Sequence, residues 1–269
     1  MSPRALITTA DDFGASPQVN EAVLRAFQEG VLRFASLMAD GPAAADAAAK
    51  ARLHPGLGVG VHLVLCPASP AAWGLRLLRD RQARRQVEGL MAAQIERCLA
   101  LGLVLTHLDS HWNAHVHPAV FPAVLRLARR YGIGRIRWPA GELGPSLAYA
   151  AGAPGRGLNP ASLLSQAALA CIYGALGLAL KRRAQGISLP PAFGMLRSGM
   201  MTEDYVVWLL RRLPEGATEI YFHPSADPGA AAGDRPTPTH QNRAELLTLL
   251  SPRVRRVLQE ERIELLSAR

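Results

Sequence analysis

Short apolar runs alternate with helix-like stretches along this chain of 269 residues, and this alternation restricts its fold more than any other feature. Runs of strand length and composition occupy residues 5–9, 34–39, 58–65, 104–108, 133–138, 219–223 and 263–266. Between them, apolar residues recur at spacings of three and four, which is typical of amphipathic helices. No antiparallel hairpin signal interrupts the pattern. We therefore expect an α/β fold of parallel β-α units, either an open doubly wound sheet or a barrel.

The helix-like stretches carry recognisable start and stop signals. In the stretch after the first run, Ser16 is the expected cap, Pro17 the first helical residue and Gly30 the stop. A later stretch, residues 117–132, ends at Gly132. Residues 151–160 and 225–240 are rich in Pro, Gly and Ala and are expected to be loops rather than domain boundaries. We expect one domain over residues 1–269.

The formal charge of +9 predicts attraction to an anionic partner. The arginines are scattered over several helical stretches without interleaved aromatic residues, so we do not expect nucleic-acid binding. Cys66, Cys98 and Cys171 lie far apart and form no C-x-x-C pair. The N-terminal residues lack the apolar core of a signal peptide. A reduced cytoplasmic location is the expectation.

Residues 157–180 contain no charged side chain and are followed by the sequence KRR. Polar residues and a proline confine the truly apolar part to residues 167–180. That length is too short to cross a hydrocarbon core about 30 Å thick. We expect a buried helix here, with a helix lying on a membrane surface as the alternative.

Unusual polar residues stand at the ends of the expected strands. They are Asp11 and Asp12 after the first strand, His62 within the third, Asp109 and His111 after the fourth, Arg137 closing the fifth, and His223 closing the strand at residues 219–223. The carboxyl ends of the strands are where an α/β barrel assembles its site. We therefore expect these side chains to converge.

Histidine is concentrated in one short segment, because His107, His111, His115 and His117 fall close together. Neutral imidazole and carboxylate are common ligands of divalent metals, and three such groups leave a position open for water. One aspartate of the adjacent pair would bind the cation, and the other would serve as general base.

Four motifs, in this order and at these separations, resemble the YdjC-like carbohydrate deacetylase family. They are TADDFGASPQVNEAV, GVGVHLVL, THLDSHWNAHVHP and TEIYFHP. The longer stretch SGMMTEDYVVWLLRRLPEGATEIYFHPSAD is similar to the hopanoid-biosynthesis-associated members, which act on a sugar attached to a polycyclic lipid. The resemblance runs from about residue 5 to the C-terminus.

The resemblance implies a barrel-like (β/α) fold and one divalent cation, Mg²⁺ or Zn²⁺, held by Asp12, His62 and His111. It makes Asp11 the expected catalytic base and His223 a catalytic acid or substrate contact. We assign Arg137, Asp109 and His115 to substrate binding, with Arg137 orienting either a carboxylate or the substrate.

The chain departs from the family pattern in two places. Family members often carry HHHVH after LDS, whereas this chain has HWNAH, so His115 either replaces or supplements His111 at the metal. Asn113 would be a poor zinc ligand. The stretch after His62 is also shorter than the usual loop, which leaves the identity of the substrate open.

The predicted reaction is removal of the N-acetyl group from an amino sugar, with a lipid-linked, hopanoid-borne N-acetylglucosamine as the predicted substrate. Alternatives are deacetylation of soluble chito-oligosaccharides, and a metal-dependent phosphoesterase or sugar isomerase. The basic charge and residues 157–180 fit peripheral association with the inner face of the membrane. The family resemblance also suggests a homodimer.

Overall fold

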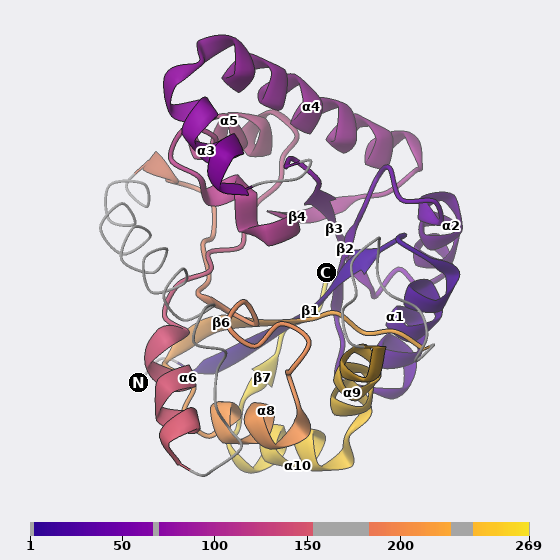
Figure 1. Cartoon of the computed structure of the whole chain (residues 1–269). Coiled ribbons are helices and arrows are strands. Elements are labelled where there is room, and N and C mark those ends of the chain that lie inside the picture. The colour runs from indigo at the N-terminus through magenta and orange to yellow at the C-terminus, as the bar shows by residue number, and fades with distance from the viewer. Residues whose placement is uncertain (1–2, 67–69, 153–182, 227–238, 269) are drawn as a thin grey trace.

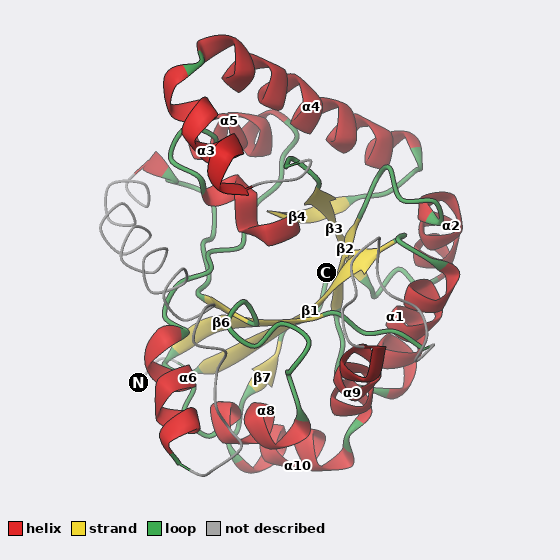
Figure 2. Ribbon diagram, in the orientation of Figure 1, coloured by secondary structure: helices red, strands yellow, loops and turns green. Residues whose placement is uncertain are grey.

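Parallel strands form one curved sheet, with helices packed around its outside (Figures 1 and 2). The computed structural model describes residues 3–66, 70–152, 183–226 and 239–268. Within these residues the strands are β1 (Arg4–Phe13), β2 (Phe34–Leu37), β3 (Gly58–Leu63), β4 (Leu105–Ser110), β5 (Ala192–Phe193), β6 (Gly216–Phe222) and β7 (Glu264–Leu265). The helices are α1 (Pro17–Glu29), α2 (Ala44–Leu53), α3 (Pro70–Arg79), α4 (Arg81–Ala100), the 3₁₀ helix η1 (His111–Val116), α5 (Phe121–Arg130), α6 (Leu143–Ala151), α8 (Glu203–Leu210), α9 (Thr239–Leu250) and α10 (Pro252–Glu260).

The strand order is β4-β3-β2-β1-β6-β5, and β7 pairs with β1. Every described pairing is parallel. This arrangement confirms the predicted α/β, barrel-like fold. Strand β1 is central, because it pairs with β2, β6 and β7.

The sheet continues beyond β4 through single bridges rather than through a strand. Leu108 bridges to Ile136, Arg135 to Ser188 and Trp138 to Pro191. Residues 133–138 were predicted to be a strand, and this prediction is wrong in detail. The facing segment contains Pro190 and Pro191, which have no N–H group to donate to a regular ladder.

Strand β1 runs further than its apolar sequence indicates. Asp11 and Asp12 were expected after the strand, but both lie inside it, and so does Asp109 inside β4. The pairing of β1 with β2 shifts register between Ala10 and Phe13, as at a β-bulge. Pairing therefore resumes at Phe13, beyond the carboxylates.

The start of α1 follows the predicted signals. Ser16 is the N-cap and its side chain accepts a hydrogen bond from the Val19 amide, while Pro17 occupies the first turn. The cap Gly30 closes the helix with a bond from its N–H to the carbonyl of Ala26. These contacts fix the helix that leads away from the Asp11–Asp12 end of β1.

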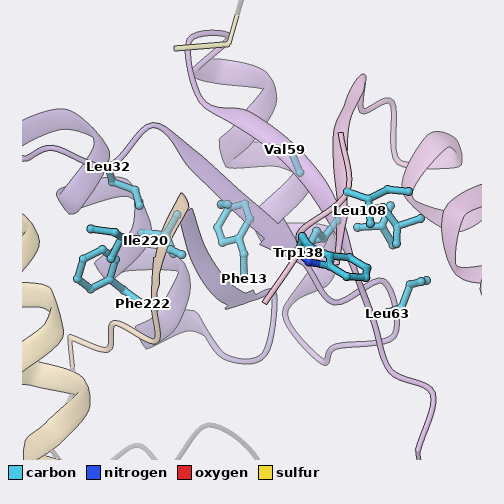
Figure 3. Close-up of a cluster of buried hydrophobic side chains, with 14 of the residues drawn as sticks. Phe13, Leu32, Val59, Leu63, Leu108, Trp138, Ile220 and Phe222 are labelled. Atoms are coloured by element: carbon cyan, nitrogen blue, oxygen red, sulfur yellow. The ribbon is translucent and has the colours of Figure 1, made fainter. Parts of the chain in front are cut away.

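A continuous apolar core fills the space between the strands and the helices. It includes Phe13 and Ile220 from neighbouring strands, together with Leu63 and Leu108 on the other side of β1 (Figure 3). Trp138 packs into the same core although it belongs to no strand (Figure 3). Burial of these side chains holds the strand ends rigid.

All of residues 157–180, and residues 227–238 of the stretch 225–240, lie outside the described residues, so the predictions for a buried helix and for a loop there stay predictions. Of the helices that are described, none combines the length and the apolar character needed to cross a bilayer.

Candidate metal and catalytic site

The polar residues predicted from the strand ends converge at one edge of the sheet. Asp11 and Asp12 come from β1, His62 from β3, and Asp109 from β4. His111 begins η1, and His223 follows β6 directly. Their meeting follows from the parallel order of the strands, since all carboxyl ends face the same way.

Three side chains form a group suited to a divalent cation. The Nε2 atom of His62 lies 3.4 Å from Oδ1 of Asp12, and Nδ1 of His111 lies 3.7 Å from the same oxygen. The ligand atoms of the three residues all lie within 4.8 Å of one another. Asp12 Oδ1 and His62 Nε2 are buried and have no hydrogen-bond partner among the residues that the structure describes. Buried polar atoms are rarely left unpaired, so a cation between these donors fits the site.

The electrostatic surroundings favour an ionised Asp12. Burial alone would raise the pKa of this carboxyl, but His111, His62 and His223 together hold it well below its usual range. The pKa of His62 responds in the opposite sense. Burial would lower it, whereas the carboxylates of Asp11, Asp109 and Asp12 raise it. An ionised carboxylate beside two imidazole rings is a donor set that suits a divalent cation.

The backbone at Asp12 is in the left-handed region, with a φ of 60°. Successive strand residues ordinarily point to opposite faces of a sheet. Here the adjacent carboxylates reach different partners at one site, since Asp11 bonds Arg137 and Asp12 approaches His62. Gly14 follows with a φ of 93°, and its N–H donates to Oδ1 of Asn20 at 2.8 Å, which anchors the turn.

A buried arginine holds Asp11. Arg137 donates from Nη1 and Nη2 to the two carboxylate oxygens of Asp11, at 2.7 and 2.6 Å. Its Nη2 also lies 2.8 Å from Asp109 Oδ2, and its Nε donates to Glu219 Oε1 at 2.9 Å. The guanidinium packs 4.0 Å above the ring of Tyr221. The Arg137 side chain is 1% exposed, so it is closed to solvent. Its charge is satisfied by these buried carboxylates.

Asp109 contacts the Nδ1 atom of His62, whereas Asp12 faces the Nε2 atom of the same ring. Its Oδ1 lies 2.7 Å from Nδ1 of His62, and its Oδ2 accepts from the hydroxyl of Ser36 at 2.6 Å. A carboxylate on one ring nitrogen fixes the imidazole and leaves the other nitrogen available for a metal. Arg137 and His62 keep the pKa of Asp109 low, although burial opposes the shift.

Three side-chain oxygen atoms lie near the two ring nitrogens of His223. Its Nε2 lies 3.8 Å from Asp11 Oδ2, and its Nδ1 lies 3.8 Å from Glu245 Oε2 and 3.3 Å from the hydroxyl of Ser198. Burial would lower the pKa of His223, but Glu245 and Asp11 raise it to about 9. The imidazole is therefore protonated at neutral pH and stands beside Asp11.

His115 lies outside the group formed by Asp12, His62 and His111. Its Nδ1 is 2.8 Å from the hydroxyl of Ser110, and its Nε2 is 2.9 Å from the carbonyl of Arg137. Burial lowers its pKa to about 4, so the ring is neutral. With both nitrogens engaged, His115 supports the loop that carries His111 and stays outside the cation group.

A second group, Asp11, His62 and Asp109, also places its ligand atoms within 4.8 Å of one another. Arg137 already binds both of these aspartates, and Asp109 already contacts Nδ1 of His62. The first group, with its unpartnered atoms, is the better cation site.

Sequence reasoning missed three residues that hold this site together, namely Ser36, Glu219 and Glu245. Ser36 stands in β2, and Glu219 in β6 is 1% exposed beside Arg137. Glu245 in α9 is fully buried and accepts from the backbone N–H groups of Met201 and His223. A glutamate in an apolar strand, as in TEIYF, is the one signal that could have singled out Glu219.

Comparison with known families matches residues 5–260 to the model of the YdjC-like protein family. Among curated proteins, a carbohydrate deacetylase of Geobacillus stearothermophilus is 46% identical over 141 residues, which are 48% of this chain and 58% of that protein. A carbohydrate deacetylase of Brevibacillus brevis is 40% identical over 147 residues, which are 50% of this chain and 59% of that protein. The matches thus span less than two thirds of these relatives.

Among solved structures, one from Enterococcus faecalis is described as a "putative cellobiose-phosphate cleavage protein". It matches with a TM-score of 0.70 and 21% identity, covering 98% of this chain and 97% of the other. This likeness shows a shared fold.

Proposed function

The chain belongs to the YdjC-like protein family, and from this premise we propose that it is a metal-dependent enzyme that removes the N-acetyl group from an amino sugar. The similar proteins of Geobacillus and Brevibacillus are named carbohydrate deacetylases, which supports the reaction class. We propose that the sugar is N-acetylglucosamine linked to a hopanoid lipid, on the basis of the motif resemblance.

One observation carries the proposal most directly. Asp12 Oδ1 and His62 Nε2 are buried and lie 3.4 Å apart, and within the described part of the chain neither atom has a hydrogen-bond partner. Asp12, His62 and His111 would hold the divalent cation. When bound, a cation of this kind supplies Lewis-acid polarisation of a carbonyl oxygen and lowers the pKa of water.

The chain's own residues would move the protons. Asp11 is fixed by Arg137 through both carboxylate oxygens, and it would accept a proton from the attacking water. His223, 3.8 Å from Asp11, is protonated near neutral pH and would donate to the departing amine nitrogen. Water adds its oxygen to the acetyl carbon, the C–N bond breaks, and the products are acetate and the free amine.

Product analysis tests this proposal. Purified protein, supplied with Mg²⁺ or Zn²⁺, is incubated in parallel with N-acetylglucosaminyl hopanoid and with N,N′-diacetylchitobiose. The masses of the products are then measured by mass spectrometry. Loss of one acetyl group from the hopanoid alone supports both the reaction and the substrate. Loss from chitobiose alone contradicts the lipid-linked substrate. Intact substrates in both reactions, with metal bound, contradict the deacetylase assignment.

A further inference from the structure

A basic groove lies between α4 and α5, on helices that the reaction does not use. We call it the arginine groove. It has a volume of about 640 Å³, and it is lined by Arg81, Arg84, Arg85 and Glu88 of α4, by Arg126 of α5, and by apolar residues of α3, of α5 and of the turn before α5. The four α4 residues are spaced at i, i+3, i+4 and i+7, so they share one face of that helix. Among the described residues, the groove therefore holds four cations and one anion.

Two of these cations already have partners. Arg126 binds Glu88 through two bonds, at 3.1 and 2.8 Å, and Arg84 donates to the carbonyls of Leu77 and Leu78 at the end of α3. Arg81 and Arg85 make no ion pair or side-chain hydrogen bond with any part of the chain that the structure describes, and both are exposed. Their charges are available to an anion.

Helix α3 places exposed apolar side chains beside the groove. Leu75 and Leu78 are 49% and 56% exposed, and their spacing of three places them on one side of the helix. Leu78 also lines the arginine groove. Exposed leucines beside unpaired cations match an anionic lipid surface, which offers phosphate groups and an apolar layer directly beneath them.

The arginine groove also adjoins the segment that follows η1, the 3₁₀ helix that begins with the candidate metal ligand His111. Helix α3 follows β3, which contains His62, and Trp73 of α3 packs against His117 with ring centroids 5.9 Å apart. His117 lies just beyond η1, which begins at His111. Figure 1 shows α3, α4 and α5 grouped together at one end of the molecule. A surface that binds the groove would thus lie close to η1.

We propose that the arginine groove, with Leu75 and Leu78, docks the protein on the headgroups of an anionic lipid bilayer. Arg81 and Arg85 bind headgroup phosphates, and the two leucines enter the interface. Nucleic acid would satisfy the arginines but would leave the leucines in water, so the bilayer is the favoured partner.

Vesicle sedimentation tests the proposal with the full-length protein. The probes are vesicles of phosphatidylcholine containing phosphatidylglycerol, and vesicles of phosphatidylcholine alone. We expect binding to the anionic vesicles, weakened at high salt because exposed charges are screened. The double variant Arg81→Gln with Arg85→Gln should bind about 30-fold more weakly, since each basic residue near an anionic surface contributes about fivefold. Leu75→Ser with Leu78→Ser should weaken binding at high salt as well.

A matched control removes the same charge elsewhere. Arg25 on α1 and Arg256 on α10 are exposed and lie away from α3, α4 and α5, so Arg25→Gln with Arg256→Gln should retain most of the binding. Circular dichroism confirms that each variant is folded. Equal loss in the control, absence of anionic-vesicle binding, or binding of inorganic pyrophosphate without binding of vesicles would overturn the proposal. The assay involves no turnover, so its failure leaves the deacetylase proposal untouched.

Discussion

Arg137 and Asp11 form a two-bond ion pair across 126 positions of sequence, with both nitrogen–oxygen distances at or below 2.7 Å. The same guanidinium also binds Asp109 and Glu219, so three buried carboxylates share one cation. The geometry of Asp11 thus depends on a residue that is closed to solvent.

Replacing Arg137 should destabilise the fold strongly. Arg137→Met leaves the carboxylates of Asp11, Asp109 and Glu219 buried without their cation, so the free energy of unfolding should fall by about 3–5 kcal/mol. Urea denaturation in the presence of a chelator measures it. Arg126→Met removes a two-bond pair with Glu88 that is exposed, and should cost less than about 1 kcal/mol. Equal losses in the two variants would contradict the role given to burial.

Substitutions of Asp11 and Asp12 should affect turnover and metal binding differently. Asp11→Asn removes the proposed proton acceptor and should lower kcat by about 10²- to 10⁴-fold, while the metal content of the purified protein stays unchanged. Asp12→Asn removes a proposed metal ligand, so this variant should lose both the bound metal and turnover. Metal content by mass spectrometry distinguishes the two, and equal retention in both variants would refute the division of roles.

Glu245 should act through His223. Because its carboxylate favours the imidazolium, Glu245→Gln should lower the pKa of His223 and move the alkaline limb of the kcat profile to lower pH. Ser198→Ala removes a neutral contact with the same ring nitrogen and should leave that limb in place. A profile that keeps its alkaline limb in Glu245→Gln would show that Glu245 is only structural.

Glu142 should make stability depend on pH. It is 3% exposed and accepts from the N–H groups of Met195 and Leu196, and burial raises its pKa to about 7. A carboxyl whose pKa is raised on folding favours the folded state at low pH, and this contribution is lost as pH rises from about 4.5 to about 7.

Glu142→Gln keeps an acceptor oxygen but cannot ionise. The free energy of unfolding of the variant, minus that of the unchanged protein, should therefore be about 2–3 kcal/mol larger at pH 8 than at pH 5. The variant is thus relatively more stable at the higher pH. Urea denaturation at both pH values measures the double difference. A difference of the same size at both pH values would mean that Glu142 is not ionised by pH 8 in the folded protein.

The predictable part of the site is the part that lies next to strands in the sequence. Asp11, Asp12, His62 and His111 were found because strand patterns and short motifs place them at one edge. The cap at Ser16 and the stop at Gly30 were predictable because those signals are local.

The partners of these residues were harder to predict, because they depend on three-dimensional packing. Glu219 and Glu245 are contributed by β6 and α9, far along the chain from the groups they contact. The missing strand at residues 133–138 has a similar cause, since its ladder depends on the prolines of a distant segment. The left-handed turn at Asp12 has no signal of its own, because aspartate tolerates that conformation without requiring it.

Strand β1 pairs with three other strands and also carries both aspartates. Any change that displaced β1 would move both carboxylates together, whereas changes in the connections after the strands would leave them in place. For laboratory evolution of a new specificity, β1 is thus a fixed reference, and the connecting loops are the adjustable part of the protein.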